Sequence, residues 1–407
     1  MIISELKNNI YALSLSIPEM KFEGMWDLPR GVTLNSYILK GDKLAIIDGA
    51  IGWNGSEDSI FSGMKRLDID PKDVDYLIVN HMEPDHSGWI SEFKKYNDHF
   101  KVITTLKGSQ MVKAFYGEDV NIMIVKEGDS LDLGKNLLLT FHPVPNVHWP
   151  ETMYTFENNS KTLFSCDMFG AFGILDTSIF YDELSNEETK IFELETIRYF
   201  SNVLTTFSSM VEKAIKKAED LNVETIATGH GPIYRSNPKI IIDFYNRLCK
   251  YAKGYGQDII TVLWGSMYGL TETMVNHVVE FLRSKGKVVN SIRVPESTES
   301  DIVTSIFKSS AIILAMPTYE YKMFPPMAHA LDEIGRKRIV NKLAFRFGSY
   351  GWSGGAEKEL LQILDTHKMN WDFIESHEFE GSAKLDDFTV IEGKLNQLIE
   401  RMVPKTI

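Results

Sequence analysis

The sequence predicts an α/β protein of two domains, and three observations support this prediction. The chain has 407 residues, which is more than one ordinary domain needs. Its first part contains short runs rich in β-branched residues, separated by turns and a few helical segments. Its last part contains apolar runs that alternate with helix-length segments. We therefore expect one domain over residues 1–250 and a second over residues 254–407.

Seven β-type runs mark expected strands of the first domain. The β-type runs cover residues 43–50, 74–81, 101–105, 121–125, 137–144, 162–167 and 225–230. The longest helical segment is expected over residues 186–220, where NEET offers acidic side chains to the positive end of a helix. Three runs, VDYLIVNH, TLFSCD and TIATGH, end in a polar residue, which is where a folded sheet would build a site.

The second domain is expected to form a doubly wound sheet of five parallel strands. The strands correspond to DIITVLWGS, VVNSIRV, SAIILAMPTY, KLAFRFGSYG and WDFIESHEF. The first two flank TETMVNHVVEFLRSKG, an amphipathic helix for which we expect Thr271 as the N-cap and Gly286 as the C-cap. Five β–α units in about 150 residues are typical of this architecture.

Composition and charge limit the classes of function. A content of 43% apolar and 24% charged residues is typical of a globular protein. No apolar run is long enough for a membrane span, and no signal peptide is expected. The net charge of −13 argues against a nucleic-acid partner. The two cysteines, Cys166 and Cys249, fit a reducing cytoplasm. They are too few for a rubredoxin or iron–sulfur centre, which needs about four cysteinyl ligands.

The stretch NHMEPDHSG, residues 80–88, contains two histidines and two acidic residues within six positions. His81, Glu83 and Asp85 are two positions apart, so an extended chain would place their side chains on one face. His86 follows directly and requires a turn. This density favours a metal site over a solvated loop.

Three later residues complete a candidate set of metal ligands. They are His148 in NVHWPETM, Asp167 in FSCDMFG and His230 in ATGHGP. Taken alone, Asp167 or His230 would more commonly be a capping or core polar group, and His142 competes with His148. Together, four imidazoles and three carboxylates can hold two metal ions that share a bridging carboxylate.

A candidate anion site follows the first strand of the second domain, in SMYGLTET. The hydroxyls of Ser266 and Thr271, with Thr273 as a further candidate, and the backbone N–H groups of a helix N-terminus can hold a phosphate monoester. The alternative is an ordinary capped helix start. The loop is neither a Walker loop nor GxGxxG, so ATP and NAD are not indicated.

Two more loops, PTYEYKMFP (317–325) and GSYGWSGGA (348–356), follow the third and fourth strands. In open α/β sheets ligands bind at the carboxyl ends of the strands, where all three loops would meet. Tyr319 and Trp352 could enclose a flat ring between them. The three loops together favour FMN as the ligand.

The motif HxExDH with a later His, Asp and His resembles the metallo-β-lactamase superfold, whose hydrolases carry HxHxDH. With a flavodoxin-like domain behind it, the whole chain resembles the flavodiiron proteins, also called A-type flavoproteins. The resemblance implies an αββα metallo-β-lactamase-like sandwich followed by a flavodoxin-like five-stranded parallel sheet. It also implies FMN and two iron ions as cofactors, and the reduction of O2 to water or of NO to N2O.

The family's pattern assigns a role to each candidate residue of both sites. One iron would take His81, Glu83 and His148, the other would take Asp85, His86 and His230, and Asp167 would bridge them. FMN would contact Ser266, Met267, Tyr268, Gly269, Leu270, Thr271, Pro317, Thr318, Tyr319, Glu320, Ser349, Tyr350, Gly351 and Trp352. Tyr199 is a candidate catalytic residue of the iron pocket, although a helix tyrosine more commonly packs in the core.

The sequence departs from the related patterns at three places. Glu83 replaces the second histidine of the hydrolases, so three carboxylates and one bridging hydroxide would neutralise two divalent ions. Such anionic oxygen ligation favours iron and redox chemistry over zinc and hydrolysis. Glu320 stands where many flavodoxin-type loops carry Asn, and an acid there would disfavour the anionic reduced flavin. Met25 and Trp26 stand where some family members have a pocket histidine.

The resemblance also implies partners. The electron donor would be a separate rubredoxin-type protein or a reduced deazaflavin, and the chain would form a head-to-tail homodimer or a dimer of dimers. Two alternatives are a dinuclear zinc hydrolase with an attached flavodoxin domain and a flavin-binding electron carrier whose first domain has lost its metals. A third keeps the fold but uses another acceptor, such as peroxide.

Overall fold

The computed structural model describes residues 1–7, 9–49 and 59–402. The chain forms two compact units. Unit 1 consists of Met1–Phe200 and Phe207–Asn246, and unit 2 consists of Ser201–Thr206 and Arg247–Ile407. None of the helices among the described residues is long and apolar enough to cross a membrane.

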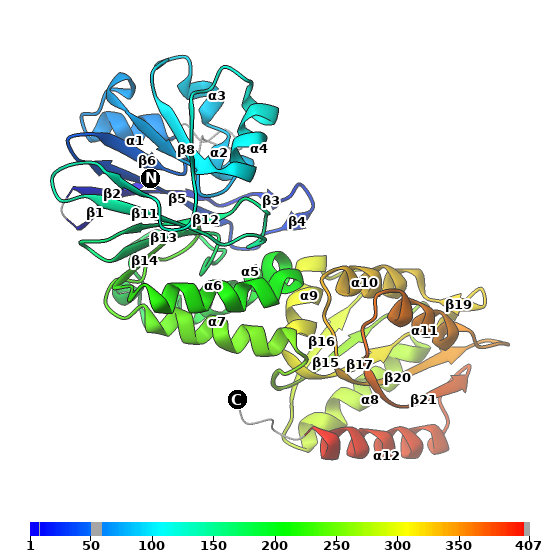
Figure 1. Cartoon of the computed structure of the whole chain (residues 1–407). Coiled ribbons are helices and arrows are strands. Elements are labelled where there is room, and N and C mark those ends of the chain that lie inside the picture. The colour runs from blue at the N-terminus through cyan, green and yellow to red at the C-terminus, as the bar shows by residue number, and fades with distance from the viewer. Residues whose placement is uncertain (8, 50–58, 403–407) are drawn as a thin grey trace. The chain divides into compact units, whose positions relative to one another are not determined.

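Unit 1 contains two large β-sheets that share a core (Figure 1), and β3 (Lys21–Phe22) and β4 (Trp26–Asp27) form a small two-stranded sheet. The seven-stranded sheet consists, in spatial order, of β1 (Ile2–Lys7), β2 (Ile10–Ile17), β5 (Val32–Lys40), β6 (Leu44–Ile47), β7 (Tyr76–Ile78), β8 (Lys101–Thr105) and β9 (Ile122–Val125). Pairing is antiparallel from β1 to β6 and parallel from β6 to β9. The five-stranded sheet consists of β10 (Ser130–Asp132), β11 (Leu138–Pro143), β12 (Met153–Glu157), β13 (Thr162–Cys166) and β14 (Thr225–Thr228).

The inner and outer faces of the seven-stranded sheet are both buried. Tyr37 and Leu39 of β5 point into the core between the sheets, whereas Ile38 packs with the helices on the other face. A strand covered on both faces is expected to be apolar almost throughout. Short helices cover the outer face: α1 (Ile60–Arg66), α2 (Pro84–Ser87), α3 (Ile90–Phe93) and α4 (Leu106–Tyr116).

Longer helices lie on the side of the five-stranded sheet, so that unit 1 is the expected αββα sandwich (Figure 1). They are α5 (Asn186–Tyr199), α6 (Ser208–Asp220) and α7 (Lys239–Ala252). The hydroxyl of Tyr154 in β12 donates to the carbonyl of Ala214 in α6 at 3.3 Å. As predicted, α5 begins with acidic residues, and Glu188 forms a capping box with Ser185.

The prediction of one helix over residues 186–220 was wrong. Helix α5 ends at Tyr199, a π-helical turn covers Phe200–Leu204, and Thr205–Phe207 form a 3-10 turn before α6. Within unit 2, Lys337 Nζ donates to the carbonyl oxygen of Asn202 at 2.6 Å. A side chain far along the chain therefore contacts the backbone within this irregular turn.

Unit 2 is built on a five-stranded sheet in which every pair is parallel. In spatial order its strands are β16 (Val288–Arg293), β15 (Gln257–Trp264), β17 (Ser309–Ala315), β20 (Leu343–Tyr350) and β21 (Asp372–Glu380). Helices α8 (Leu270–Ser284) and α12 (Leu385–Arg401) pack on one face, where Met274 and Ile391 meet Phe345 and Phe347. Its other helices are α9 (Glu299–Lys308), α10 (Pro325–Arg336) and α11 (Ala356–Thr366). The predicted doubly wound, flavodoxin-like sheet is confirmed.

The N-cap of α8 differs from the prediction. The cap is Gly269, whose φ of +86° is a left-handed conformation that glycine adopts without strain. Thr271 is the second residue of the helix, and its hydroxyl is 2.9 Å from the hydroxyl of Ser349. Gly286 follows the C-cap Lys285 with a φ of +74°, as a glycine at the end of a helix commonly does.

Candidate metal centre and flavin site

The seven predicted metal ligands all follow the carboxyl ends of strands of unit 1. His81 and Glu83 follow strand β7, and Asp85 and His86 lie on the next helix, α2. His148 follows β11, Asp167 follows β13 and His230 follows β14. Pro84 begins α2, since its fixed φ suits the first helical position. The turn between β7 and α2 therefore brings Asp85 and His86 close to His81 and Glu83.

Asp167 Oδ2 belongs to a first cluster of donor atoms. It lies 3.2 Å from His81 Nε2 and 3.2 Å from His148 Nε2. Glu83 Oε2 lies 3.3 Å from His81 Nε2 and 3.0 Å from His148 Nε2. These four side chains each offer one ligand atom within 4.8 Å of the others.

Asp167 Oδ1 belongs to a second cluster. It lies 3.0 Å from His86 Nε2 and 3.2 Å from His230 Nε2. Asp85 Oδ2 lies 3.6 Å from His86 Nε2 and 3.4 Å from His230 Nε2. The two oxygens of one carboxylate therefore face two separate sets of donors, which is the arrangement that a bridging ligand of two metal ions requires.

The clusters are buried, and their pKa values reflect how closely acids and imidazoles are held. Burial disfavours a charged His81, but the Asp167 carboxylate and a hydrogen bond to Glu151 outweigh burial and raise its pKa to about 10. Burial raises the pKa of Glu83, but hydrogen bonds from His148 and His81 lower it to about 2. For Asp85 burial prevails, and its pKa is raised. The acids and imidazoles of the two clusters are therefore close enough to shift one another's pKa values.

The donor set fits metal ions. Asp85 Oδ1 is buried and has no hydrogen-bond partner among the described residues, and the Nε2 atoms of His86 and His230 lie 3.1 Å apart. Buried polar atoms without partners are costly, and metal coordination is one way to satisfy them. The mixture of imidazole and carboxylate ligands suits iron or zinc, and the share of carboxylates favours iron.

Several residues around the clusters were not predicted. Glu151 accepts hydrogen bonds from His81 Nδ1 and from the Met82 N–H, both at 2.8 Å. Behind His86, Cys166 Sγ lies 3.6 Å and Asp48 Oδ2 lies 3.7 Å from its Nδ1 atom. No sequence signal marks Glu151 or Asp48, because their roles depend on contacts between distant segments.

Other predicted residues of unit 1 are also placed by the structure. Tyr199 is buried at the end of α5, with its ring centroid 5.8 Å from that of His230, and burial raises its pKa well above the usual value. His142 lies away from the clusters, with Nδ1 2.7 Å from Glu127 Oε1. The β4 residue Trp26 is buried, whereas Met25 is 60% exposed.

In unit 2 the three predicted loops line one cavity of about 330 Å³, within the usual range of about 300–1,000 Å³ for ligand pockets. Its lining consists of Ser266, Met267, Tyr268, Leu270, Thr271, Pro317, Thr318, Tyr319, Glu320, Ser349, Tyr350, Gly351, Trp352 and Gly381. Gly269 caps the adjacent helix and donates its N–H to Ser266 Oγ at 3.1 Å. Gly381 was not predicted; it follows β21, the fifth strand whose carboxyl end reaches this edge.

The polar groups of this cavity fit a phosphorylated ligand. The hydroxyls of Thr271 and Ser349 meet at the first turn of α8, and Thr318 Oγ1 is buried without a hydrogen-bond partner in the described part of the chain. The Thr273 hydroxyl instead donates to the Gly269 carbonyl at 3.1 Å, and Thr273 does not line the cavity. Two of the three hydroxyls proposed for the cradle are therefore in place.

Aromatic side chains stand around the same cavity. Tyr319 is 42% and Trp352 is 76% exposed, and both line it. Trp352 Nε1 donates to the hydroxyl of Tyr321 at 3.2 Å, so a tyrosine that was not predicted orients the indole. Exposed rings at the mouth of a cavity suit a planar ligand.

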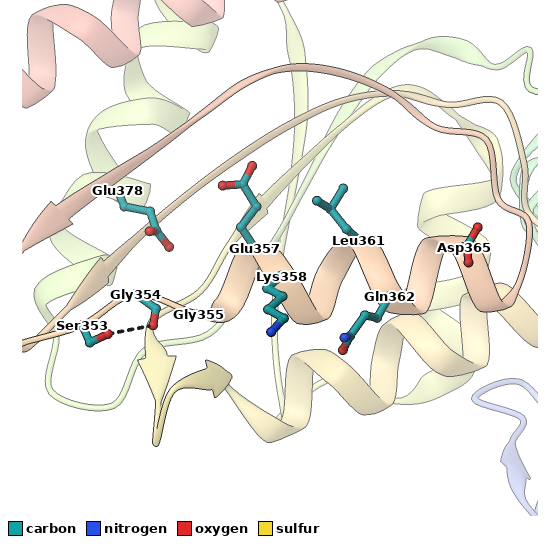
Figure 2. A pocket seen from close by; sticks show the side chains of 9 residues that line it. All are labelled: Ser353, Gly354, Gly355, Glu357, Lys358, Leu361, Gln362, Asp365 and Glu378. Atoms are coloured by element: carbon teal, nitrogen blue, oxygen red, sulfur yellow. Dashed lines mark hydrogen bonds between the residues drawn. The ribbon is translucent and has the colours of Figure 1, made fainter.

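The third loop continues past the cavity into α11 and forms one wall of a more open hollow of about 800 Å³ (Figure 2). Two glycines of this wall, Gly354 and Gly355, have close neighbours. A Cβ at Gly354 would lie 2.7 Å from Glu378 Oε2, and one at Gly355 would lie 2.1 Å from the backbone oxygen of Tyr321. The third loop is therefore packed directly against β21 and against the second loop.

Comparison with known proteins identifies the class. The sequence model of a family described as ODP family beta lactamase matches residues 32–231. The anaerobic nitric oxide reductase flavorubredoxins of Salmonella arizonae and Escherichia coli are 32% identical over 366 residues, or 88% of this chain and 74% of theirs. The fold and the clusters thus define a metallo-β-lactamase-like metalloprotein joined to a flavodoxin-like unit. The chain belongs to the flavodiiron family of oxidoreductases.

Solved structures agree with this assignment. A mutant of the flavo di-iron protein of Thermotoga maritima superimposes with a TM-score of 0.88 at 27% identity, covering 99% of each chain. Rubredoxin oxygen:oxidoreductase of Desulfovibrio gigas shares the fold, with a TM-score of 0.89 at 24% identity over 98% of each chain. Flavodiiron proteins bind FMN and a diiron site, so the zinc hydrolase alternative is not favoured.

Proposed function

We propose that this chain passes electrons through FMN to a non-haem diiron site and there reduces O2 to water, NO to N2O, or both. The observation that carries the proposal is Asp167, whose two carboxylate oxygens face two separate sets of imidazole and carboxylate donors. Relatives named for nitric oxide reduction and for oxygen reduction support both gases as substrates.

We assign the ligands of the two irons from these distances. His81, Glu83 and His148 would hold one iron, Asp85, His86 and His230 would hold the other, and Asp167 would contribute to both. When bound, the irons supply the electrons and the coordination sites at which the gas is reduced. Glu83 adds a negative charge where the related hydrolases carry a neutral histidine, and this charge favours the higher oxidation state of iron.

Tyr199 is proposed as a pocket residue beside His230. Burial raises the pKa of its phenol well above the usual value, so the hydroxyl keeps its proton at neutral pH. A protonated phenol can donate a hydrogen bond to a ligand on that side of the centre. Replacing Tyr199 with Phe removes this donor and keeps the ring, whose centroid lies 5.8 Å from that of His230.

FMN is assigned to the cavity of unit 2. Ser266, Thr271 and Ser349 would hold the phosphate, together with backbone N–H groups at the start of α8. The isoalloxazine ring would lie against Tyr319 and Trp352. Glu320 lines the cavity as well, and an acid beside the ring would disfavour the anionic reduced form of the flavin.

The electron donor is proposed to be a separate rubredoxin-type protein or a reduced deazaflavin. The two cysteines of these 407 residues, Cys166 and Cys249, are both buried, and two cysteines cannot form a four-cysteine centre. They also fit a reducing cytoplasmic location. We further propose a head-to-tail homodimer or a dimer of dimers, since Tyr268 (87% exposed) and Trp352 (76% exposed) offer apolar surface beside the flavin cavity.

Steady-state reduction of O2 and of NO with a chemical reductant and rubredoxin tests the proposal. We expect two irons and one FMN per chain, and consumption of at least one gas. A protein that contains zinc and consumes neither gas would overturn it. Comparing the two rates on one preparation also decides which gas is preferred.

A further inference from the structure

Glu151 is a buried carboxylate that meets His81 on the side opposite the proposed iron. It is 1% exposed. Its Oε1 atom accepts hydrogen bonds from His81 Nδ1 and from the Met82 backbone N–H, both at 2.8 Å. Its backbone oxygen accepts a hydrogen bond from the Thr105 hydroxyl at 3.0 Å. Glu151 is therefore held at both its backbone and its side chain.

These contacts fix which nitrogen of His81 faces the cluster. The Met82 N–H can only donate, so Glu151 Oε1 acts as an acceptor at this point. His81 Nδ1 then carries the hydrogen that it shares with the carboxylate. The lone pair of Nε2 is left to face Glu83 and Asp167, which is the form in which an imidazole binds a metal through Nε2.

The second cluster does not repeat this arrangement. The atoms facing His86 Nδ1 are Cys166 Sγ at 3.6 Å and Asp48 Oδ2 at 3.7 Å. A thiol is a weak partner, and 3.7 Å exceeds a hydrogen-bond distance. The other oxygen of Asp48 accepts the Asn80 N–H at 2.9 Å. His230 Nδ1 is buried and, within the described ranges, has no hydrogen-bond partner.

We infer that Glu151 is a positioning residue that makes the metal position formed by His81, Glu83 and His148 the tighter of the two. The inference rests on the proposed ligand set. The ligands alone give no reason for the two positions to differ in metal affinity, since each has two imidazoles and one carboxylate besides Asp167. A carboxylate behind a histidine ligand fixes its ring and raises its basicity, and losing such a partner typically costs about 10–100-fold in metal affinity.

The test is anaerobic dialysis of the full-length Fe(II) protein against a graded series of chelator concentrations, followed by measurement of the iron retained. We expect the wild-type protein to release its two irons in separate steps. Glu151→Gln keeps the shape of the side chain and a carbonyl acceptor but removes the charge. In this variant the chelator concentration that removes the more tightly bound iron should fall by about 10–100-fold, toward that of the weaker position. The concentration that removes the more weakly bound iron should not change.

Glu157→Gln is the matched control. Glu157 is also a buried carboxylate, 1% exposed, and accepts the backbone N–H groups of Leu138, Asn159 and Ser160. Its release curve should follow the wild type. Because Glu157 serves backbone amides, a general effect of neutralising a buried acid would appear in this variant as well.

The other outcomes test the inference about Glu151 and the proposed ligand set separately. If Glu151→Gln follows the wild-type curve, if the wild type releases both irons in one step, or if both steps of the variant weaken together, the inference fails. Weaker binding of both irons would indicate a general loss of structure instead of a selective effect on the metal position that contains His81. If the wild type does not bind two irons, or if His81→Ala retains both, the proposed ligand set fails instead.

Discussion

Replacing Gly355 with Ala should weaken FMN binding by separating two of the three flavin loops. A Cβ at this position would lie 2.1 Å from the backbone oxygen of Tyr321, in the second loop. Ordinary contact requires about 3.4 Å, so one loop must move by roughly 1 Å. The glycine also has a φ of +151°, which strains any other residue by about 1–3 kcal/mol. A strain of this size corresponds to a loss of about 5–150-fold in affinity if FMN binding must restore the original loop positions.

Titration of the apoprotein with FMN, followed by quenching of flavin fluorescence, measures this loss. Gly393→Ala is the control, because the structure places nothing within 4 Å of a Cβ on this α12 residue. Its FMN affinity should equal that of the wild type. The iron content of Gly355→Ala should also be unchanged, because the proposed iron ligands all belong to unit 1. If Gly355→Ala binds FMN as tightly as the wild type, the packing of the loops does not determine flavin affinity.

Three further predictions concern charge, stacking and pH. Glu83→His should lower iron loading and abolish oxygen reduction, and unchanged turnover would refute the charge argument. Trp352→Ala should weaken FMN binding or shift its potential, and unaltered flavin content and potential would refute a contact with the ring. Burial lowers the pKa of Lys342 to about 7, whereas the unfolded lysine titrates near 10.5. Unfolding between these values takes up a proton, so the free energy of unfolding should rise with pH from about 7 to about 10.5, by at most about 1.4 kcal/mol per unit. Urea unfolding of the wild type and Lys342→Met across this range checks the effect; equal slopes would refute it.

Hydrophobic patterns predicted much of the fold, because apolar runs of strand length mark strands that are covered on both faces. They missed β5, whose sequence VTLNSYILK contains three polar residues that are buried in the structure. Asn35 shows why: its side-chain amide donates to the carbonyls of Thr228 and Gly231, and its oxygen accepts from Ser14. Such partners lie far away in the sequence, so no local pattern reveals that the polar residue is satisfied.

The same limit applies to the candidate sites. The HxExDH motif could be recognised because its chemistry is concentrated in six residues, and the later ligands each end or follow a strand. Glu151 carries no such mark, although it lies within NVHWPETM beside a predicted ligand. No local signal marks the break after Tyr199 either, and the Asn202 carbonyl within it accepts a hydrogen bond from Lys337, a residue far along the chain.

The residues of the two candidate cofactor sites are divided cleanly between the units. Every proposed iron ligand lies in unit 1, and every residue lining the flavin cavity lies in unit 2. The residues proposed for each cofactor therefore come from a single unit of the chain. If loading is independent, the fraction of chains that carry both cofactors is the product of the two occupancies. If half of the chains carried FMN and half carried iron, only about one-quarter of the chains would carry both. Turnover calculated per chain would then be about fourfold lower than that of a complete molecule.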